Sequence, residues 1–129
     1  MEMRVALDTN RLTDLFRGDA ALAEWLETCD EVWILLIVVA EIKAAFYAGA
    51  QQERNQIQLR KLLSKATFRI LLPGRETAEQ YARVFVQLKC AGTPIPDNDL
   101  WIAALALEHD LMLITRDRHF RHIPQLVCG

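Results

Sequence analysis

Two carboxylates stand two residues apart in the stretch Ile95–Ala104, directly after a proline and directly before an apolar run. The run Leu100–Leu107 is too long and too apolar for a surface loop, so it predicts a buried helix. Pro96 ends any element before it, and Asp97 is then expected at the N-cap with Asp99 in the first turn. Capping uses one carboxylate, and two so close together repel each other unless a cation lies between them.

Three further acids stand beside apolar segments elsewhere in the chain. Asp8 directly follows Met3–Leu7, and Asp117 follows Leu111–Ile114 after two residues. Asp8 and Asp117, each taken alone, could be ordinary helix caps. Glu41 is harder to explain in this way, because an acid within an apolar run is seldom buried without a partner.

Apolar segments alternate with helical patterns along the chain, which predicts βαβ units, a parallel sheet and helices on both faces. The strands are expected at Met3–Leu7, Val32–Val39, Phe68–Leu72 and Leu111–Ile114, with Gln125–Val127 as a candidate edge strand. Helices are expected after Asp8, from Asp19 to Thr28, from near Val38 to Gly49, and over Gln51–Lys65, Thr77–Ala91 and Asp97–His109, with a short turn at His119–Ile123.

The carboxyl ends of parallel strands meet at one edge of a sheet, and ligands bind there. Each of the acids follows a strand or opens a helix, so this scaffold brings all of them to the same edge: Asp8, Glu41, Asp97, Asp99 and Asp117. Oxygen-only ligands suit hard ions such as Mg²⁺ or Mn²⁺. A cation of this kind activates water and orients in-line attack on a phosphodiester, so a hydrolase needs no serine, cysteine or histidine nucleophile.

Size and composition predict one domain over residues 1–129 that is soluble and cytoplasmic. The longest uncharged stretch, Val32–Ala40, is too short to cross a bilayer, and the N-terminus lacks a signal-peptide layout. The three cysteines and three histidines show no zinc spacing, so the thiols are expected to be free. The net charge of −2 argues against a nucleic-acid partner. Without the five clustered acids, however, 12 acids remain against 15 basic residues, so the rest of the chain has a charge of +3.

Four segments resemble the PIN domain, and more narrowly the VapC toxins of bacterial toxin–antitoxin pairs. They are Leu7–Leu15, Val39–Ile42, Ile95–Ala104 and Leu113–Phe120, of which Ile95–Ala104 is the most specific. The resemblance covers nearly the whole chain. The chain departs from the family pattern around the glutamate, at Leu36, Ala44 and Ala45, and again at Arg116.

The resemblance implies a Rossmann-like three-layer α/β/α sandwich with a mostly parallel sheet of four to five strands. It also implies an endoribonuclease dependent on Mg²⁺ or Mn²⁺, a homodimer, and a VapB-type antitoxin that inserts a segment into the active site. By position, Asp8, Glu41 and Asp97 would be the principal metal ligands. Asp99 would contact metal less directly, and with Asp117 it would complete the cluster or form a weaker second metal site. Hydrogen bonds from Thr9, Asn10 and Thr115 would orient carboxylates or water.

Four basic residues neighbour the acids in sequence and are candidate contacts to RNA phosphates: Arg11, Lys43, Arg116 and Arg118. Two other functions remain open. A phosphatase of the haloacid-dehalogenase type also begins with a strand and an aspartate, but it needs a second aspartate where this chain has Asn10. A catalytically silent PIN-like domain could instead act as a binding or regulatory subunit, and the intact set of acids argues against it.

Overall fold

The computed structural model describes residues 2–129 and contains a four-stranded sheet in which all neighbours are parallel, with the order β3-β2-β1-β4. The strands are β1 (Arg4–Leu7), β2 (Glu31–Leu35), β3 (Phe68–Leu71) and β4 (Met112–Ile114). Leu7 lies opposite Ile34 on one side and Ile114 on the other. The central strands therefore end together, and the segments that follow them start at one common edge, as the sequence predicts.

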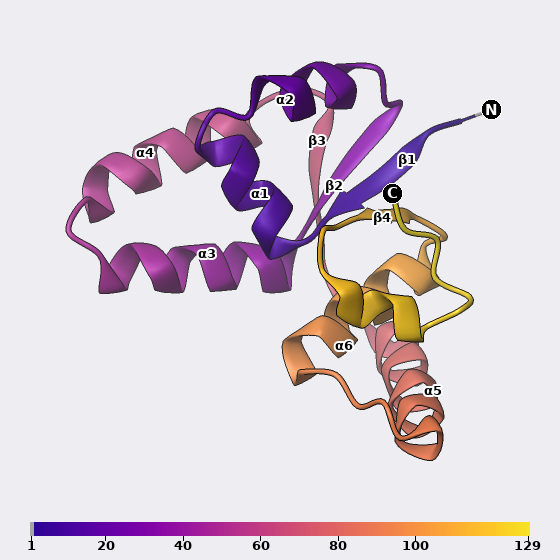
Figure 1. Cartoon of the computed structure of the whole chain (residues 1–129). Helices are drawn as coiled ribbons and strands as arrows, with labels where there is room; N and C mark the ends of the chain where they lie inside the picture. The colour runs from indigo at the N-terminus through magenta and orange to yellow at the C-terminus, as the bar shows by residue number, and fades with distance from the viewer. Residues whose placement is uncertain (1) are drawn as a thin grey trace.

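Six α-helices and one 3-10 helix surround the sheet among the described residues. They are α1 (Thr9–Phe16), α2 (Ala20–Glu27), α3 (Leu36–Ala48), α4 (Gln52–Leu63), α5 (Arg75–Ala91), α6 (Asp97–Glu108) and η1 (Arg118–His122). The chain moves outward from β1 to β2 to β3 and then returns to place β4 beyond β1. Because parallel crossovers are right-handed, this reversal puts α1–α4 on one face and α5 and α6 on the other, and Figure 1 shows these two groups.

The apolar run Val32–Val39 divides differently from the prediction. Strand β2 ends at Leu35 and α3 begins at Leu36, two residues before the expected turn. Both parts of the run are apolar, so an apolar pattern alone does not mark the boundary. The expected end of this helix at Gly49 is confirmed, since Gly49 is its C-cap.

The candidate edge strand Gln125–Val127 is not a strand. Only a single bridge joins Leu113 to Cys128, although the backbone of Leu113 bonds to both Val127 and Gly129. The C-terminal residues thus cover the outer edge of β4 without extending the sheet. None of the helices in residues 2–129 has the length and apolarity needed to cross a membrane.

Candidate active site

A pocket of about 260 Å³ lies at the carboxyl edge of the sheet, where α1, α6 and η1 begin and the second turn of α3 passes. Four of the five predicted carboxylates line it: Asp8, Glu41, Asp99 and Asp117. They come from segments as far apart as residues 8 and 117, and the parallel sheet brings them together. Asn10, Asn98 and His119 line the same pocket.

Asp8 is held by hydrogen bonds to both of its carboxylate oxygens. It follows β1 directly and caps α1, where Oδ1 accepts from the backbone N–H of Arg11 at 2.9 Å. The hydroxyl of Thr115 donates to Oδ2. Asp8 is only 3% exposed, and this burial raises the pKa of its carboxyl, with the negative charge of Asp117 adding to the effect and the hydrogen bonds opposing it.

Glu41 lies in the second turn of α3, because that helix begins earlier than the sequence suggests. The Thr9 hydroxyl donates to Oε1 at 2.8 Å, and the Asn98 side-chain amide donates to Oε2 at 2.9 Å. Three segments, α1, α3 and α6, therefore fix one carboxylate. The sequence analysis does not single out Asn98, although this residue stands between the two acids of the Ile95–Ala104 stretch.

The sequence analysis expects Asp97 to face the other acids more directly than Asp99, and the structure shows the reverse. Pro96, not Asp97, is the N-cap of α6, and the structure shows no side-chain capping bond there. Asp97 is exposed outside the pocket and accepts a hydrogen bond from the Tyr81 hydroxyl. Asp99 is 9% exposed and lines the pocket. Successive residues of a helix are turned by about 100°, so residues two apart point in nearly opposite directions, and only one of the two carboxylates faces the other acids.

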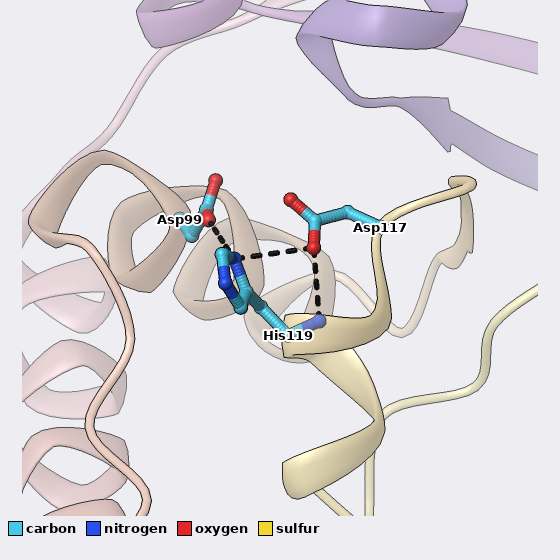
Figure 2. Close-up of side chains that lie close together, drawn as sticks. All are labelled: Asp99, Asp117 and His119. Carbon is cyan, nitrogen blue, oxygen red and sulfur yellow. Dashed lines mark hydrogen bonds and ion pairs between the residues drawn. The ribbon is translucent and has the colours of Figure 1, made fainter.

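Asp99, Asp117 and His119 form the tightest cluster in the pocket. One oxygen from each carboxylate and one ring nitrogen of His119 lie within 4.8 Å of one another, and Figure 2 shows the ring beside both acids. Burial raises the pKa of the Asp99 carboxyl, and the charges of Asp117 and Glu41 add to this, whereas the hydrogen bond to His119 lowers it. His119 is missing from the predicted site residues, although it stands only two residues after Asp117.

The basic residues proposed as RNA contacts lie in different environments. Arg11 and Arg116 both pair with Asp14, and Arg116 does so through two nitrogens at 2.9 and 3.0 Å. Lys43 donates to Gln56 at 2.8 Å, and Arg118 is exposed on η1. Two of the four cations are therefore partly neutralised by a neighbouring acid.

The donor set of the pocket suits a divalent cation. Four carboxylates supply oxygen ligands, which are the ligands that hard divalent ions prefer. The pKa of Asp8 and that of Asp99 are both raised by burial, so the charged forms of these groups are held at a disadvantage until positive charge is supplied. A cation in this pocket removes that disadvantage.

Comparison with known proteins identifies relatives along almost the whole chain. The PIN domain family matches residues 5–126. The chain is 31% identical to VapC ribonuclease Y4jK of Sinorhizobium fredii over 88% of this chain and 86% of that protein. It is 33% identical to Ribonuclease VapC1 of Haemophilus influenzae over 93% of this chain and 92% of that protein.

Solved structures give the same result for the fold. VapBC2 from Rickettsia felis, bound to a DNA fragment from the promoter, superposes with a TM-score of 0.91, at 26% identity and 98% coverage of both chains. VapBC-1 from nontypeable Haemophilus influenzae superposes with a TM-score of 0.89, at 27% identity, over 98% of this chain and 97% of that chain.

Proposed function

This chain belongs to the PIN-domain family, and we propose that it is a VapC-type toxin, a metal-dependent endoribonuclease that hydrolyses RNA phosphodiester bonds. The observation that carries the proposal is the meeting of Asp8, Glu41, Asp99 and Asp117 in one pocket at the carboxyl edge of the sheet. Helix capping accounts for Asp8 and Asp117 taken singly, but it does not explain why Glu41 and Asp99 lie in the same pocket. The relatives named as VapC ribonucleases support the same activity.

We propose that these four acids hold Mg²⁺ or Mn²⁺, and that Asp97 is not a ligand because its carboxylate accepts the Tyr81 hydroxyl outside the pocket. A bound ion of this kind activates water and offsets charge at the phosphorus. Four acids suffice for one ion, or for one ion with a weaker second site.

The protein's own contribution is to hold the acids in place before substrate arrives. Thr115 fixes Asp8, while Thr9 and Asn98 fix the two oxygens of Glu41. Partners of this kind orient ligands and strengthen a metal site. Asn10 lines the pocket from the first turn of α1 and is placed to hydrogen bond water or substrate.

We propose RNA as the substrate and a VapB-type antitoxin as the partner, since the structural neighbours are VapBC assemblies. Arg118 and Lys43 are the cations best placed to meet RNA phosphates, because Arg11 and Arg116 are already paired with Asp14. Both RNA and antitoxin would meet this chain in the cytoplasm. We also propose that residues 1–129 form a single PIN domain.

We also propose a homodimer, and the exposed apolar residues near β3 support it. Leu36, Ile70 and Leu72 are 41, 45 and 62% exposed, and β3 is an edge strand. An apolar groove of about 550 Å³ lies next to them, lined by Ile37, Pro73, Gly74, Arg75, Trp101 and Leu105. A second copy of the chain would cover this surface.

The test is RNA cleavage by the purified chain, freed of antitoxin, with the cut sites mapped at nucleotide resolution. We expect cleavage that requires added Mg²⁺ or Mn²⁺ and that is lost in Asp99→Asn and Asp8→Asn. Asp97→Asn is the matched control, since it makes the same chemical change two residues away, and it should keep most of the activity. Cleavage that survives in Asp99→Asn without metal would refute the proposal. Tight antitoxin binding with no cleavage of any RNA would favour the silent binding subunit.

A further inference from the structure

His119 places one ring nitrogen against two carboxylates at once. Its Nδ1 lies 3.2 Å from Oδ2 of Asp99 and 3.1 Å from Oδ1 of Asp117. Figure 2 shows the ring beside both acids, with Asp99 on α6 and Asp117 on the turn that leads into η1. The same nitrogen is therefore shared by two separate elements of the fold.

The backbone holds His119 in this place. Asp117 caps η1 by accepting from the backbone N–H of His119 at 2.9 Å, so acid and imidazole are joined within one turn. The next residue, Phe120, is 1% exposed and anchors η1 in the core. The imidazole itself is about half exposed, with 49% of the side chain accessible, so the ring borders the mouth of the pocket and is not a packed core residue.

The two nitrogen–oxygen separations match those between adjacent ligands of a small octahedral ion. Adjacent ligands that lie about 2.1 Å from an ion at right angles are separated by about 3.0 Å. The two nitrogen–oxygen separations, 3.1 and 3.2 Å, have this value, and the two oxygens lie within 4.8 Å of each other.

We propose that Nδ1 of His119 is a metal ligand, together with Asp99 and Asp117, and that it makes the pocket prefer divalent transition ions over Mg²⁺. This proposal rests on the proposed metal site. Mg²⁺ takes oxygen ligands, whereas an imidazole nitrogen suits first-row transition ions. When Nδ1 is bound to the ion, the ring proton lies on Nε2, which the exposed ring can present to water.

The test uses Mn²⁺ as the probe, because pulsed electron paramagnetic resonance detects nitrogen bound to Mn²⁺ directly. Without RNA present, the wild-type protein loaded with one equivalent of Mn²⁺ should show a ¹⁴N coupling, which changes to the ¹⁵N pattern when histidine is labelled with ¹⁵N. His119→Ala should lose the coupling and bind Mn²⁺ about 10-fold or more weakly, with Mg²⁺ affinity changed less than about 3-fold. His122→Ala, an exposed histidine of the same short helix, is the control and should match the wild type.

The outcomes separate this proposal from the proposed function. Mn²⁺ that binds wild type without nitrogen coupling, or equal losses of Mn²⁺ and Mg²⁺ affinity in a folded His119→Ala, would overturn the role of His119 and leave the carboxylate site standing. Failure of the wild type to bind Mn²⁺ at all would overturn both. Circular dichroism of His119→Ala confirms that the variant is folded before either comparison is made.

Discussion

Replacing Asp99 with asparagine should stabilise the metal-free protein while removing its response to metal. Asp99 is 9% exposed and shares the pocket with Asp117 and Glu41. Without a cation these like charges repel one another, and burial adds to the disadvantage of the charged form. Asparagine has nearly the same shape as aspartate and carries no charge, so the repulsion disappears and the packing is kept.

The size of the effect follows from the separation of the charges. Oxygens of Asp99 and Asp117 lie within 4.8 Å, and two unit charges at about this distance repel by roughly 3.5 kcal/mol at an effective dielectric constant of about 20. The pocket opens to solvent, and the bond between Asp99 and His119 is weakened in the variant, so we expect about 1–2 kcal/mol. For a chain of 129 residues, 1 kcal/mol shifts the melting temperature by roughly 4 °C, which gives a rise of about 4–8 °C in EDTA at pH 8.

The gain should depend on pH in a direction set by the raised pKa of Asp99. The ordinary value is 3.8, and the folded protein raises it. The folded state therefore binds its proton more tightly than the unfolded state, and the wild type loses stability as pH rises through this range. The advantage of Asp99→Asn should be present at pH 8 and vanish well below pH 3.8, where Asp99 is protonated in both the folded and the unfolded state.

Metal should reverse the order of the melting temperatures, so that the wild type unfolds at a higher temperature than Asp99→Asn. A ligand at 100 times its dissociation constant stabilises the folded state by about 2.7 kcal/mol, or roughly 10 °C for this chain. Wild type and Asp97→Asn should gain this in Mg²⁺, and Asp99→Asn should gain little. Thermal unfolding in EDTA and in Mg²⁺ measures all six values. A metal response in Asp99→Asn equal to that of the wild type, or a melting temperature in EDTA below that of the wild type, would refute the reasoning.

Three further predictions concern positioning, assembly and packing. Asn98→Ala should reduce RNA cleavage about 10- to 100-fold with the melting temperature nearly unchanged, because the change frees one oxygen of Glu41. Thr9→Val, which frees the other oxygen, should show a similar loss in a kinetic assay. Wild-type cleavage rates in both variants would contradict this positioning role. Leu72→Glu should convert the homodimer to a monomer in light scattering, whereas a monomeric wild type would contradict the dimer. Ile102→Ala should lower the free energy of unfolding by about 2–5 kcal/mol in urea denaturation, because Ile102 is 1% exposed; a loss below 1 kcal/mol would contradict its place in the core.

The sequence predicts the order and type of the elements because each strand is a short apolar run and each long helix has a recognisable stripe or cap. It predicts boundaries less well where the residues on both sides are apolar. At Leu35 and Leu36 an apolar strand passes into an apolar helix, and neither a polar cap nor a change of periodicity marks the join. The C-terminal bridge at Cys128 depends on backbone bonds to Leu113, which composition does not encode.

The exchange of Asp97 and Asp99 follows from helical geometry together with the packing of Trp101, which the sequence does not reveal. Asp99 shares a helix face with the apolar Ala103, whereas Asp97 shares one with Trp101, whose ring stacks on Tyr81 at 4.3 Å. Helical geometry turns the two carboxylates in nearly opposite directions, and the stacking of Trp101 on Tyr81 leaves Asp99 as the inward acid. The contact of His119 with Asp99 had no comparable signal, since it depends on where η1 packs against α6.

The hydrogen bond between Thr115 and Asp8 joins residues that are 107 positions apart, and β4 lies directly against β1. During translation the first strand leaves the ribosome long before the last one is made. A nascent chain that lacks β4 has neither Thr115 to fix Asp8 nor Asp117 to complete the pocket. In the ribonuclease that we propose, the pocket is therefore complete only once β4 and the turn after it have folded back against β1.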